Sequence, residues 1–304
     1  MNIPFVSVFI LTYNQEQFIA QTLESILSQK TNFSFQLVIG DDYSIDSTRI
    51  ICEKYEKDYG NKIKLLPNLG KNIGLIANYI RTIKECDGKY IAICDGDDYW
   101  IDFLKLQKQV DFLEKHVEFS IVYTKVKKLF PDGKFKDSVV IPNKSDSEFD
   151  DLIYDNFIPS VTALFRNNQN ISELPSWICK YPYGDWPTYL WTIKDGSKIY
   201  FLNEITAVYR MDIGVSSKIR KVISDIIKIN LDITQDIYND VNFKHKRAIV
   251  KEALDKKNMS LMARFNRERS YFKAMKLFIN NLKFILKNYK FTKIYLYSIY
   301  KSFS

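Results

Sequence analysis

Three carboxylates lie within four residues at Asp95-Gly96-Asp97-Asp98, directly after the apolar run Tyr90 to Cys94. Carboxylates this close repel one another unless a cation or a proton compensates their charge. Proteins hold hard divalent ions such as Mg²⁺ through one or two carboxylates together with phosphate oxygens of a substrate. The cluster therefore indicates a site for Mn²⁺ or Mg²⁺ beside phosphates, and a solvated acidic turn is the alternative.

Two further polar groups follow apolar runs in the same way. Asp41-Asp42 comes after residues 35–40, and Thr12-Tyr13-Asn14 comes after residues 5–11. A carboxylate in such a position can accept a hydrogen bond from a nucleobase or a ribose hydroxyl, and Tyr13 could stack on a base. The alternatives are helix capping near Asp41-Asp42 and a polar turn with a half-buried tyrosine at Tyr13.

Strand and helix patterns alternate over the first hundred residues. Strands are expected over residues 5–11, 35–40, 62–66 and 90–94, and helices over residues 16–29, 46–59 and 72–86. This alternation predicts an α/β fold with a mostly parallel sheet and helices on both of its faces. Ligands of such sheets bind beyond the carboxyl ends of the strands, so the three polar groups are expected to share one crevice.

The later part of the chain predicts fewer strands. We expect a helix over 102–115, a strand over 119–123, a hairpin within 125–150, a strand over 160–165, a helix over 185–193 and a strand with a loop over 198–208. From about residue 218 onward the apolar spacing is helical throughout. The expected organisation is an α/β domain over residues 1–215 and a helical C-terminal region over residues 216–304.

The positive charge is concentrated at the C-terminus. The chain has a net charge of +8. Residues 271–304 contain seven lysines and no acidic residue, so they account for all but one unit of that charge. An enzyme of nucleic acids more often spreads positive charge over its working face, so we expect no nucleic-acid partner.

The cysteines and the N-terminal residues indicate a compartment. The four cysteines lack the spacing of a zinc site or a disulfide framework, which favours a reducing environment. The chain starts with Met1 to Pro4 directly before the first strand pattern, and no apolar stretch reaches the roughly 20 residues of a spanning helix. We expect a cytoplasmic protein. His116 and His245 lie outside every motif, so no imidazole-based mechanism is expected.

The polar groups, taken in order, resemble a known family. The segment from Pro4 to Asn14, then Asp41 to Thr48, then Gly88-Lys89-Tyr90-Ile91 leading into Asp95 to Asp98, is similar to the family-2 glycosyltransferases over roughly residues 3–212. The resemblance implies a GT-A fold, a nucleotide-diphosphate sugar as donor with a UDP-sugar favoured, a divalent metal, and inversion at the anomeric carbon.

The resemblance also assigns residues to the donor. Nucleotide contacts are expected from Thr12, Tyr13, Asn14, Asp41, Asp42, Asn72, Asn78 and Asp95. Asp97 is the expected direct metal ligand, and Asp95 is expected to assist it while lying nearer the ribose.

An inverting transfer needs a general base that takes the proton of the attacking hydroxyl. The family keeps an aspartate at the start of a later helix, and Asp185 in Gly184-Asp185-Trp186 fits that position. The preceding Tyr181 to Gly184 is turn-prone, and a simple N-cap is the alternative role for Asp185.

One position departs from the family pattern. The family often has a histidine where this chain has Asp212, in Tyr209-Arg210-Met211-Asp212. Asp212 could still contact the metal, and Arg210 could compensate phosphate charge. The acceptor pocket is expected from residues 125–183, with Thr162, Trp177 and Trp186 as candidate sugar contacts.

The C-terminal tail shows helical periodicity. Its apolar residues Phe272, Met275, Ile279, Leu282, Leu286 and Tyr289 recur at spacings of three and four, with Lys276, Lys283, Lys287 and Lys290 beside them. One amphipathic helix is expected, which either packs on the catalytic domain or lies on an anionic membrane. We favour peripheral contact with the inner face of the cell membrane, because no acidic residue relieves the lysines and the acceptors of such enzymes are often lipid-linked.

The resulting prediction is sugar transfer to a hydroxyl of a glycan or lipid-linked acceptor, in the assembly of a surface polysaccharide. A non-catalytic protein of the same fold that binds nucleotide sugars or carbohydrates is the main alternative. A sugar nucleotidyltransferase is disfavoured because residues 12–16 contain no glycine-rich phosphate loop.

Overall fold

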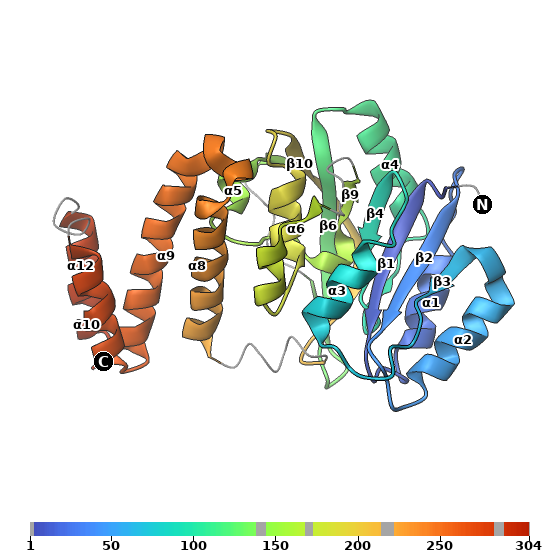
Figure 1. Ribbon diagram of the computed structural model, residues 1–304, viewed down its shortest axis with the longest axis horizontal. Helices are drawn as coiled ribbons and strands as arrows, with labels where there is room; N and C mark the ends of the chain where they lie inside the picture. The colour runs from blue at the N-terminus through green and yellow to red at the C-terminus, as the bar shows by residue number, and fades with distance from the viewer. Residues whose placement is uncertain (1–2, 138–143, 168–172, 214–221, 283–288, 304) are drawn as a thin grey trace. The chain divides into compact units, whose positions relative to one another are not determined.

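The computed structural model describes residues 3–137, 144–167, 173–213, 222–282 and 289–303. The chain forms two compact units, Met1–Ser217 and Lys218–Ser304. The first unit contains one sheet with helices against both of its faces, and the second is helical (Figure 1).

The sheet of the first unit has ten strands among the described residues, in the order β3-β2-β1-β4-β9-β6-β10-β5, with β7 beside β6 and β8 beside β10. The strands are β1 (Val6–Thr12), β2 (Phe35–Asp41), β3 (Ile63–Leu65), β4 (Tyr90–Ile93), β5 (Tyr99–Trp100), β6 (Phe119–Leu129), β7 (Phe135–Asp137), β8 (Asp146–Ser147), β9 (Leu164–Arg166) and β10 (Lys198–Arg210).

The expected parallel arrangement is correct for the N-terminal half of the sheet, where β3, β2, β1 and β4 are all parallel. It also holds for the long pair of β6 and β10, which run parallel to each other. Strand β9 enters antiparallel between β4 and β6, and β5, β7 and β8 also pair antiparallel, so the sheet is mixed and not entirely parallel.

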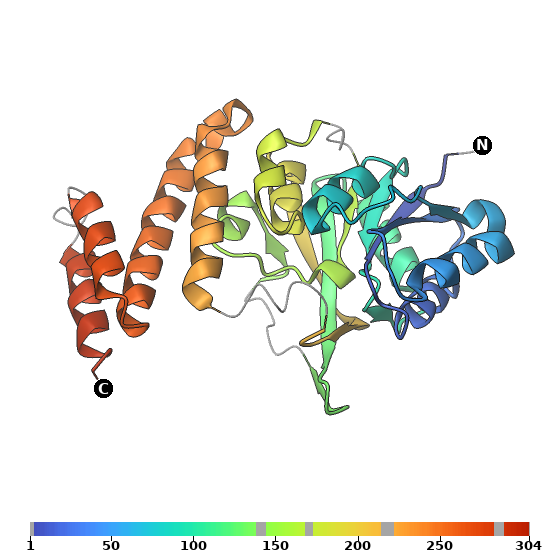
Figure 2. The same cartoon turned by 60° about the horizontal axis from the view of Figure 1, so that its bottom comes forward.

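Six α-helices accompany this sheet in the described part of the first unit: α1 (Ile19–Leu27), α2 (Thr48–Tyr59), α3 (Leu75–Ile83), α4 (Lys105–Lys115), α5 (Phe149–Leu152) and α6 (Asp185–Thr192). Strand β1 is buried on both faces, and its side chains alternate between two helix layers. Val8 belongs to the core cluster with Leu23 of α1 and Val110 of α4, whereas Phe9 packs edge-on against Tyr79 of α3. Helices α1 and α4 thus cover one face of the sheet, and α3 covers the other (Figures 1 and 2).

Two expected element boundaries are corrected by side-chain contacts with the backbone. Helix α3 begins at Leu75 and not at Asn72, because the Asp42 carboxylate accepts the N–H groups of Ile73 and Gly74, and Gly74 has a φ of +88°. The expected strand 160–165 is a 3-10 turn at Ser160–Thr162 followed by β9. The side chains of Trp100 and Gln109 bind the carbonyls of Val161 and Thr162, which therefore form no strand pairing.

The second unit consists of α8 (Ile223–Asn239), α9 (Arg247–Arg267), α10 (Tyr271–Asn280) and α12 (Tyr289–Tyr300), with a 3-10 segment at Val241–Lys246. Helix α9 packs against the other three. The single helix expected over 272–289 is wrong, because α10 ends at Asn280, where the Asn281 amide folds back onto the Leu277 carbonyl. Leu286, Lys283 and Lys287 lie outside the described residues. In the described parts of the chain, no helix is both long and apolar enough to cross a membrane.

Candidate active site

The polar groups at the strand ends meet at one edge of the sheet. Thr12 and Asp41 are partners in the register of β1 and β2, and the N–H of Asp42 donates to the Thr12 carbonyl at 3.0 Å. The N–H of Gly96 donates to the Leu11 carbonyl at 2.8 Å, which attaches the acidic cluster to the same strand end. The parallel arrangement of β2, β1 and β4 thus places all three groups side by side.

The acidic cluster is held from several elements. The Thr22 hydroxyl of α1 donates to the carbonyls of Gly96 and Asp98 at 3.0 and 2.6 Å. Asp98 is buried, and its Oδ1 accepts the N–H of Arg210 at 2.8 Å. Asp95 and Asp97 are partly exposed and lie on the side that solvent reaches. Asp98 is thus the structural anchor, and Asp95 and Asp97 are the carboxylates that a ligand could reach.

The charge of Arg210 compensates the carboxylates only in part, because burial outweighs it. Burial, together with the charges of Asp97 and Asp185, raises the pKa of Asp95 to about 7. Burial also raises the pKa of Asp97, and burial with the neighbouring Asp97 charge raises the pKa of Asp98. A bound cation would remove the cost of ionising this cluster.

The donor set fits a hard divalent ion. Three buried oxygens around the cluster have no hydrogen-bond partner among the described residues, namely Thr12 Oγ1, Gln15 Oε1 and Asp98 Oδ2. Every candidate ligand atom is oxygen, as Mg²⁺ and Mn²⁺ prefer. Over the described ranges, no group of three or more His, Cys, Asp or Glu side chains is placed to hold a metal ion by itself. An ion at this cluster would have to complete its shell with substrate phosphates.

Arg210 binds the acidic cluster from the protein interior. Its guanidinium lies between the rings of Phe18 and Tyr99, 4.7 Å from each ring centre, and donates to the Asp97 carbonyl and to Gln21 Oε1. Only 6% of the residue is exposed. The expected phosphate contact is therefore corrected to a structural role, because the guanidinium faces the protein.

The loops after β1 and β2 are bound to each other. The Asn14 N–H donates to Ser44 Oγ at 2.9 Å, and Asn14 Oδ1 accepts the Ile45 N–H at 2.9 Å. Asn14 and Tyr43 both have positive φ, +51° and +62°, a conformation that non-glycine residues adopt at a cost and that is concentrated at functional sites. Tyr13 is partly exposed beside these loops.

Both aspartates of Asp41-Asp42 are nearly buried and bind backbone groups. Asp41 accepts the hydroxyl and the N–H of Ser44, and the Asp42 carboxylate accepts Ile73 and Gly74 N–H at 2.8 and 2.9 Å. Asn72 donates to the Asp42 carbonyl at 3.0 Å. These contacts join the loops after β2 and before α3, and each oxygen of the Asp42 carboxylate retains capacity for a second hydrogen bond.

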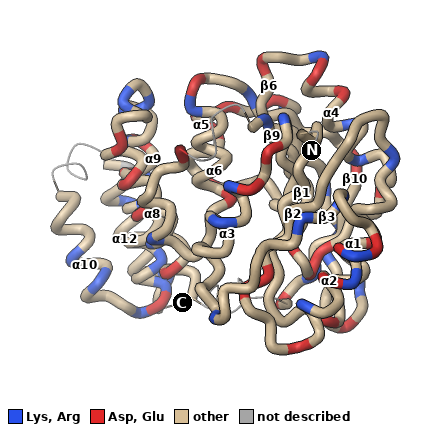
Figure 3. Tube along the Cα trace, turned by 45° about the vertical axis from the view of Figure 1, so that its right-hand side comes forward, with Lys and Arg blue, Asp and Glu red and all other residues tan. Residues whose placement is uncertain are grey.

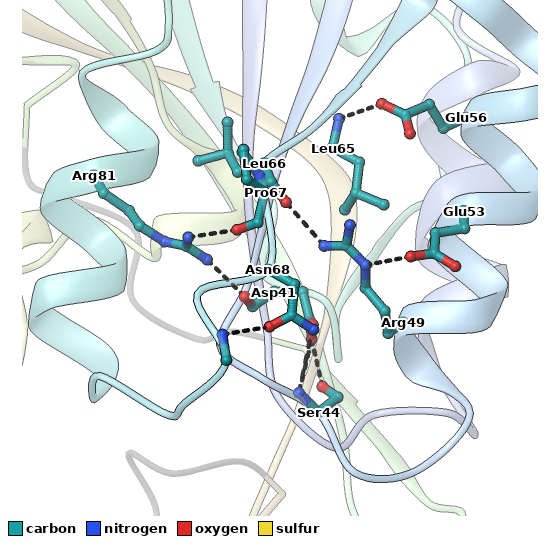
Figure 4. A network of polar contacts seen from close by, with 11 residues as sticks. Asp41, Ser44, Arg49, Glu53, Glu56, Leu65, Leu66, Pro67, Asn68 and Arg81 are labelled. Atoms are coloured by element: carbon teal, nitrogen blue, oxygen red, sulfur yellow. Dashed lines mark hydrogen bonds and ion pairs between the residues drawn. The ribbon is translucent and has the colours of Figure 1, made fainter.

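Two arginines, on α2 and α3, bind backbone carbonyls near the ends of β2 and β3 (Figure 4). Arg81 of α3 donates to the carbonyls of Asp41 and Pro67 at 2.6 and 3.0 Å, and Arg49 of α2 donates to the Leu66 carbonyl at 2.8 Å. Sequence reasoning missed both arginines, since a single arginine on a helix belongs to no motif. Their contacts fix the strand end that carries Asp41.

Asn78 is corrected from a donor contact to a core residue. It is 1% exposed, its amide group donates to the Gly40 carbonyl at 2.7 Å, and its Oδ1 accepts Arg81 Nε at 2.8 Å. Both ends of the side chain are therefore occupied by protein groups of the sheet and of α3.

Asp185 opens α6, as expected, and is partly exposed. Its charge contributes to the raised pKa of Asp95, so the two carboxylates lie near each other. The preceding Gly184 lies against the ring of Tyr79 so closely that a Cβ there would be 2.6 Å from a ring carbon. The Tyr79 hydroxyl is 3.0 Å from Thr188 Oγ1, which fixes the first turn of α6 to α3.

Two of the three candidate acceptor contacts are wrong. Thr162 and Trp186 are completely buried, and they bond to the carbonyls of Pro159 and Leu152. Trp177 is partly exposed, with its ring edge-on to Tyr181 at 6.3 Å. Asp212 is exposed after β10 with a φ of +60°, and no described hydrogen bond joins it to Asp95 or Asp97.

This architecture is that of GT-A enzymes. Parallel strands end in nucleotide-type loops and in an acidic cluster, and antiparallel strands complete the sheet. Residues 7–172 match the family described as Glycosyl transferase family 2. The chain belongs to this family.

Sequence relatives agree with this family. An uncharacterised protein of Mycobacterium tuberculosis is 34% identical over 208 residues, which are 67% of this chain and 58% of that protein. The chain thus matches less than two thirds of that relative's length. The putative teichuronic acid biosynthesis glycosyltransferase TuaG of Bacillus subtilis is 30% identical over 210 residues, 68% of this chain and 79% of that protein.

Solved structures share the fold at low identity. S. aureus TarS in complex with UDP has a TM-score of 0.60 and 18% identity, covering 98% of this chain and 89% of that one. The mannosyltransferase PcManGT of Pyrobaculum calidifontis, in complex with GDP-Man and Mn²⁺, has a TM-score of 0.56 and 14% identity, with 98% and 86% covered. These likenesses show the GT-A fold.

Proposed function

We propose that this chain transfers a sugar from a nucleotide-diphosphate sugar to an acceptor hydroxyl, in the assembly of a surface polysaccharide. The observation that carries the proposal is the convergence of the nucleotide-type loops, the acidic cluster and Asp185 at one end of the sheet. A UDP-sugar is the favoured donor. Structures of S. aureus TarS with UDP and with UDP-GlcNAc support that choice, and TuaG, by its name, supports the pathway class.

Each group has a task in the proposed reaction. Thr12, Tyr13, Asn14, Asp41, Asp42 and Asn72 surround the nucleoside. The acceptor oxygen bonds to the anomeric carbon while the bond from that carbon to the diphosphate oxygen breaks. Asp185 takes the hydroxyl proton, and the nucleoside diphosphate leaves with the bonding electron pair. Attack opposite the leaving group inverts the anomeric configuration.

Metal dependence is part of the proposal. Asp97 would hold Mn²⁺ or Mg²⁺ with help from Asp95, and Asp212 is a further candidate ligand. When bound, the ion neutralises the negative charge that develops on the departing diphosphate. The unpartnered oxygens beside the cluster and the Mn²⁺ in the PcManGT structure support this part.

The test removes the negative charge of each carboxylate in turn. Asp185→Asn and Asp97→Ala should each lower transfer from a nucleotide sugar by at least about 100-fold, since proton transfer and leaving-group stabilisation each contribute on that scale. Asp58→Asn, at the exposed end of α2, is the control and should keep wild-type transfer. Folded Asp185→Asn and Asp97→Ala variants with near wild-type rates would contradict the assignment.

A non-catalytic binding protein of the same fold makes a different prediction. It would bind a nucleotide sugar with Mn²⁺, seen as a rise in Tm, but would neither transfer nor slowly hydrolyse it. Hydrolysis of donor that depends on Asp97 supports the enzyme, whereas binding without any turnover supports the alternative.

We further propose that the enzyme works in the cytoplasm at the inner face of the cell membrane, on a lipid-linked or glycan acceptor. The structure changes the expected surface from one helix to two. Helices α10 and α12 lie side by side, since Tyr271 stacks on Phe303 and Phe278 stacks on Tyr295 at 5.9 and 4.3 Å between ring centres. One side of the pair packs on α9 through Ala274, Leu277 and Phe291, among others.

Apolar side chains on the pair remain exposed. They are Phe272, Met275 and Ile279 on α10, and Leu296, Tyr297, Tyr300 and Phe303 on and just after α12. Lys273, Lys276, Lys293 and Lys301 are exposed as well, and residues 271–304 contain no acid. The lysines of α10 are drawn blue in Figure 3. Apolar side chains mixed with lysines alone suit a surface of anionic lipid.

Vesicle co-sedimentation of the full chain tests this location. Binding should be strong to phosphatidylcholine vesicles that contain phosphatidylglycerol and weak to phosphatidylcholine alone. Lys276→Gln with Lys293→Gln should weaken it by about fivefold per lysine, since each is worth about 1 kcal/mol near an anionic surface. Lys54→Gln with Lys57→Gln, exposed on α2, removes the same charge elsewhere and should not weaken it. Equal binding by both pairs, or no binding at all, refutes the membrane proposal.

A further inference from the structure

One short segment touches both functional carboxylates. Asn156 Nδ2 donates to Asp185 Oδ2 at 3.0 Å, and Ser160 Oγ lies 3.5 Å from Asp95 Oδ2. Only four positions separate the two contacts in the sequence. The segment 156–160 therefore connects the carboxylate expected to take the proton with the carboxylate beside the leaving group.

The orientation of the Asn156 amide is fixed by its own backbone contact. Asn156 Oδ1 accepts the N–H of Ile158 at 3.2 Å, so the amide nitrogen is the atom that faces Asp185. Ile158 itself is buried, which holds this turn in place. The Asn156 side chain thus presents a hydrogen-bond donor in a set direction.

The other end of the segment is anchored in the core. Ser160 begins a 3-10 turn whose next two carbonyls, from Val161 and Thr162, accept Trp100 Nε1 at 2.9 Å and Gln109 Nε2 at 2.8 Å. Gln109 also donates to the Val122 carbonyl of β6 at 3.1 Å. The position of Ser160 is therefore set by buried groups of the sheet and not by the site itself.

The backbone of Asp185 is fixed independently. The contact of Gly184 with Tyr79 and the Tyr79–Thr188 hydrogen bond place the start of α6. They do not determine how the carboxylate is rotated about its side-chain bonds. The Asn156 amide is a contact that does so, and a charge-assisted bond of this kind is stronger than a neutral one.

We propose that residues 156–160 form a positioning element that sets the orientation of Asp185 relative to Asp95, with Asn156 as the positioning residue on the acceptor side. This rests on the proposed function, in which Asp185 is the base. The two ends of the element have different effects: Asn156 acts on proton removal, and Ser160 acts on the metal and diphosphate side.

The experiment compares Asn156→Leu and Ser160→Ala in the full chain, with a nucleotide sugar as donor and Mn²⁺. Leucine keeps the branching and the number of side-chain heavy atoms of asparagine without the donor. Asn156→Leu should lower kcat roughly 10- to 100-fold, the scale of a misoriented catalytic group, and leave KM for the donor within about twofold. Ser160→Ala should instead raise the Mn²⁺ concentration for half-maximal rate.

Asn167→Leu is the matched control. The Asn167 amide donates to the carbonyls of Cys86 and Gly88 at 3.0 Å each, away from both carboxylates. It should lower stability without a selective loss of kcat. Equal kinetic effects of Asn156→Leu and Asn167→Leu would reduce Asn156 to a structural residue and overturn the inference.

Asp185→Asn, measured in parallel, distinguishes failure of the positioning inference from failure of the base assignment. If Asp185→Asn is inactive while Asn156→Leu keeps its kcat, the positioning inference is wrong and the base assignment stands. If Asp185→Asn keeps wild-type transfer, the assignment of the base is wrong and the inference falls with it.

Discussion

Lys105 is a buried amine whose titration should be visible in the stability of the first unit. It is the first residue of α4 and is completely buried. Its Nζ lies 2.8 Å from Gln109 Oε1 and 4.2 Å from the centre of the Trp100 ring. Burial lowers the pKa of Lys105 to about 7, against smaller opposing effects of Cys94 and Asp102. The start of a helix also disfavours a positive charge.

The sign of the effect follows from proton binding. In the unfolded chain Lys105 keeps its proton up to pH values near its ordinary pKa of 10.5, whereas in the folded chain it loses the proton near pH 7. Between these values the unfolded state binds more protons, so stability rises with pH. Each pH unit in this window adds about 1.4 kcal/mol to the free energy of unfolding, or about 2 to 3 kcal/mol between pH 7 and pH 9 after partial titration at pH 7.

Lys105→Met removes the titrating group and keeps most of the side-chain volume. The wild type should gain about 2 to 3 kcal/mol in free energy of unfolding between pH 7 and pH 9, and the variant should lack this gain. The difference, variant minus wild type, should therefore fall by the same amount. Urea unfolding followed by tryptophan fluorescence measures it, because all four tryptophans lie in the first unit. Lys115→Met, exposed at the other end of α4, should show a constant difference. A constant difference for Lys105→Met would refute a neutral buried amine.

Three further predictions concern the site. Gly184→Ala should lower the free energy of unfolding by about 1 to 3 kcal/mol through overpacking and kcat by at least tenfold, because the alanine Cβ would be 2.6 Å from a Tyr79 ring carbon. Urea unfolding measures the stability, and steady-state rates measure kcat. Arg210→Lys should raise the half-saturating Mn²⁺ concentration, since lysine replaces neither the stacking between Phe18 and Tyr99 nor the forked hydrogen bonds. EDTA should abolish transfer and the rise in Tm given by UDP, and Mn²⁺ or Mg²⁺ should restore both; unchanged UDP binding in EDTA would contradict the proposed metal contact with the diphosphate.

The sheet edge that carries the site was predictable because its strands are buried on both faces. Such strands read as continuous apolar runs, as in Val6 to Leu11, and their parallel order fixes which ends meet. The antiparallel entry of β9 was not predictable, because a three-residue strand carries no pattern that distinguishes the two directions.

The errors within the site have a common cause. Thr162, Trp186 and Asn78 are residue types that often contact sugars or nucleotides. Their types therefore suggested ligand contacts, but a side chain can contact a ligand only where it is exposed. Each is instead used to satisfy a buried carbonyl. Lys105 shows the opposite case, because lysines are rarely buried and the structure buries this one completely.

The C-terminal helices show why periodicity alone does not determine what covers an apolar surface. Spacings of three and four residues predicted one apolar face, and Phe272, Met275 and Ile279 do lie on one face of α10. The structure adds a second apolar face, formed by Ala274, Leu277 and Phe278, and this is the face that packs against α9. A helix that needed only α9 for stability would carry polar residues on its outer face. Exposure of 74% at Phe272, beside lysines without acids, therefore supports a second contact for α10, and the charge supports an anionic one.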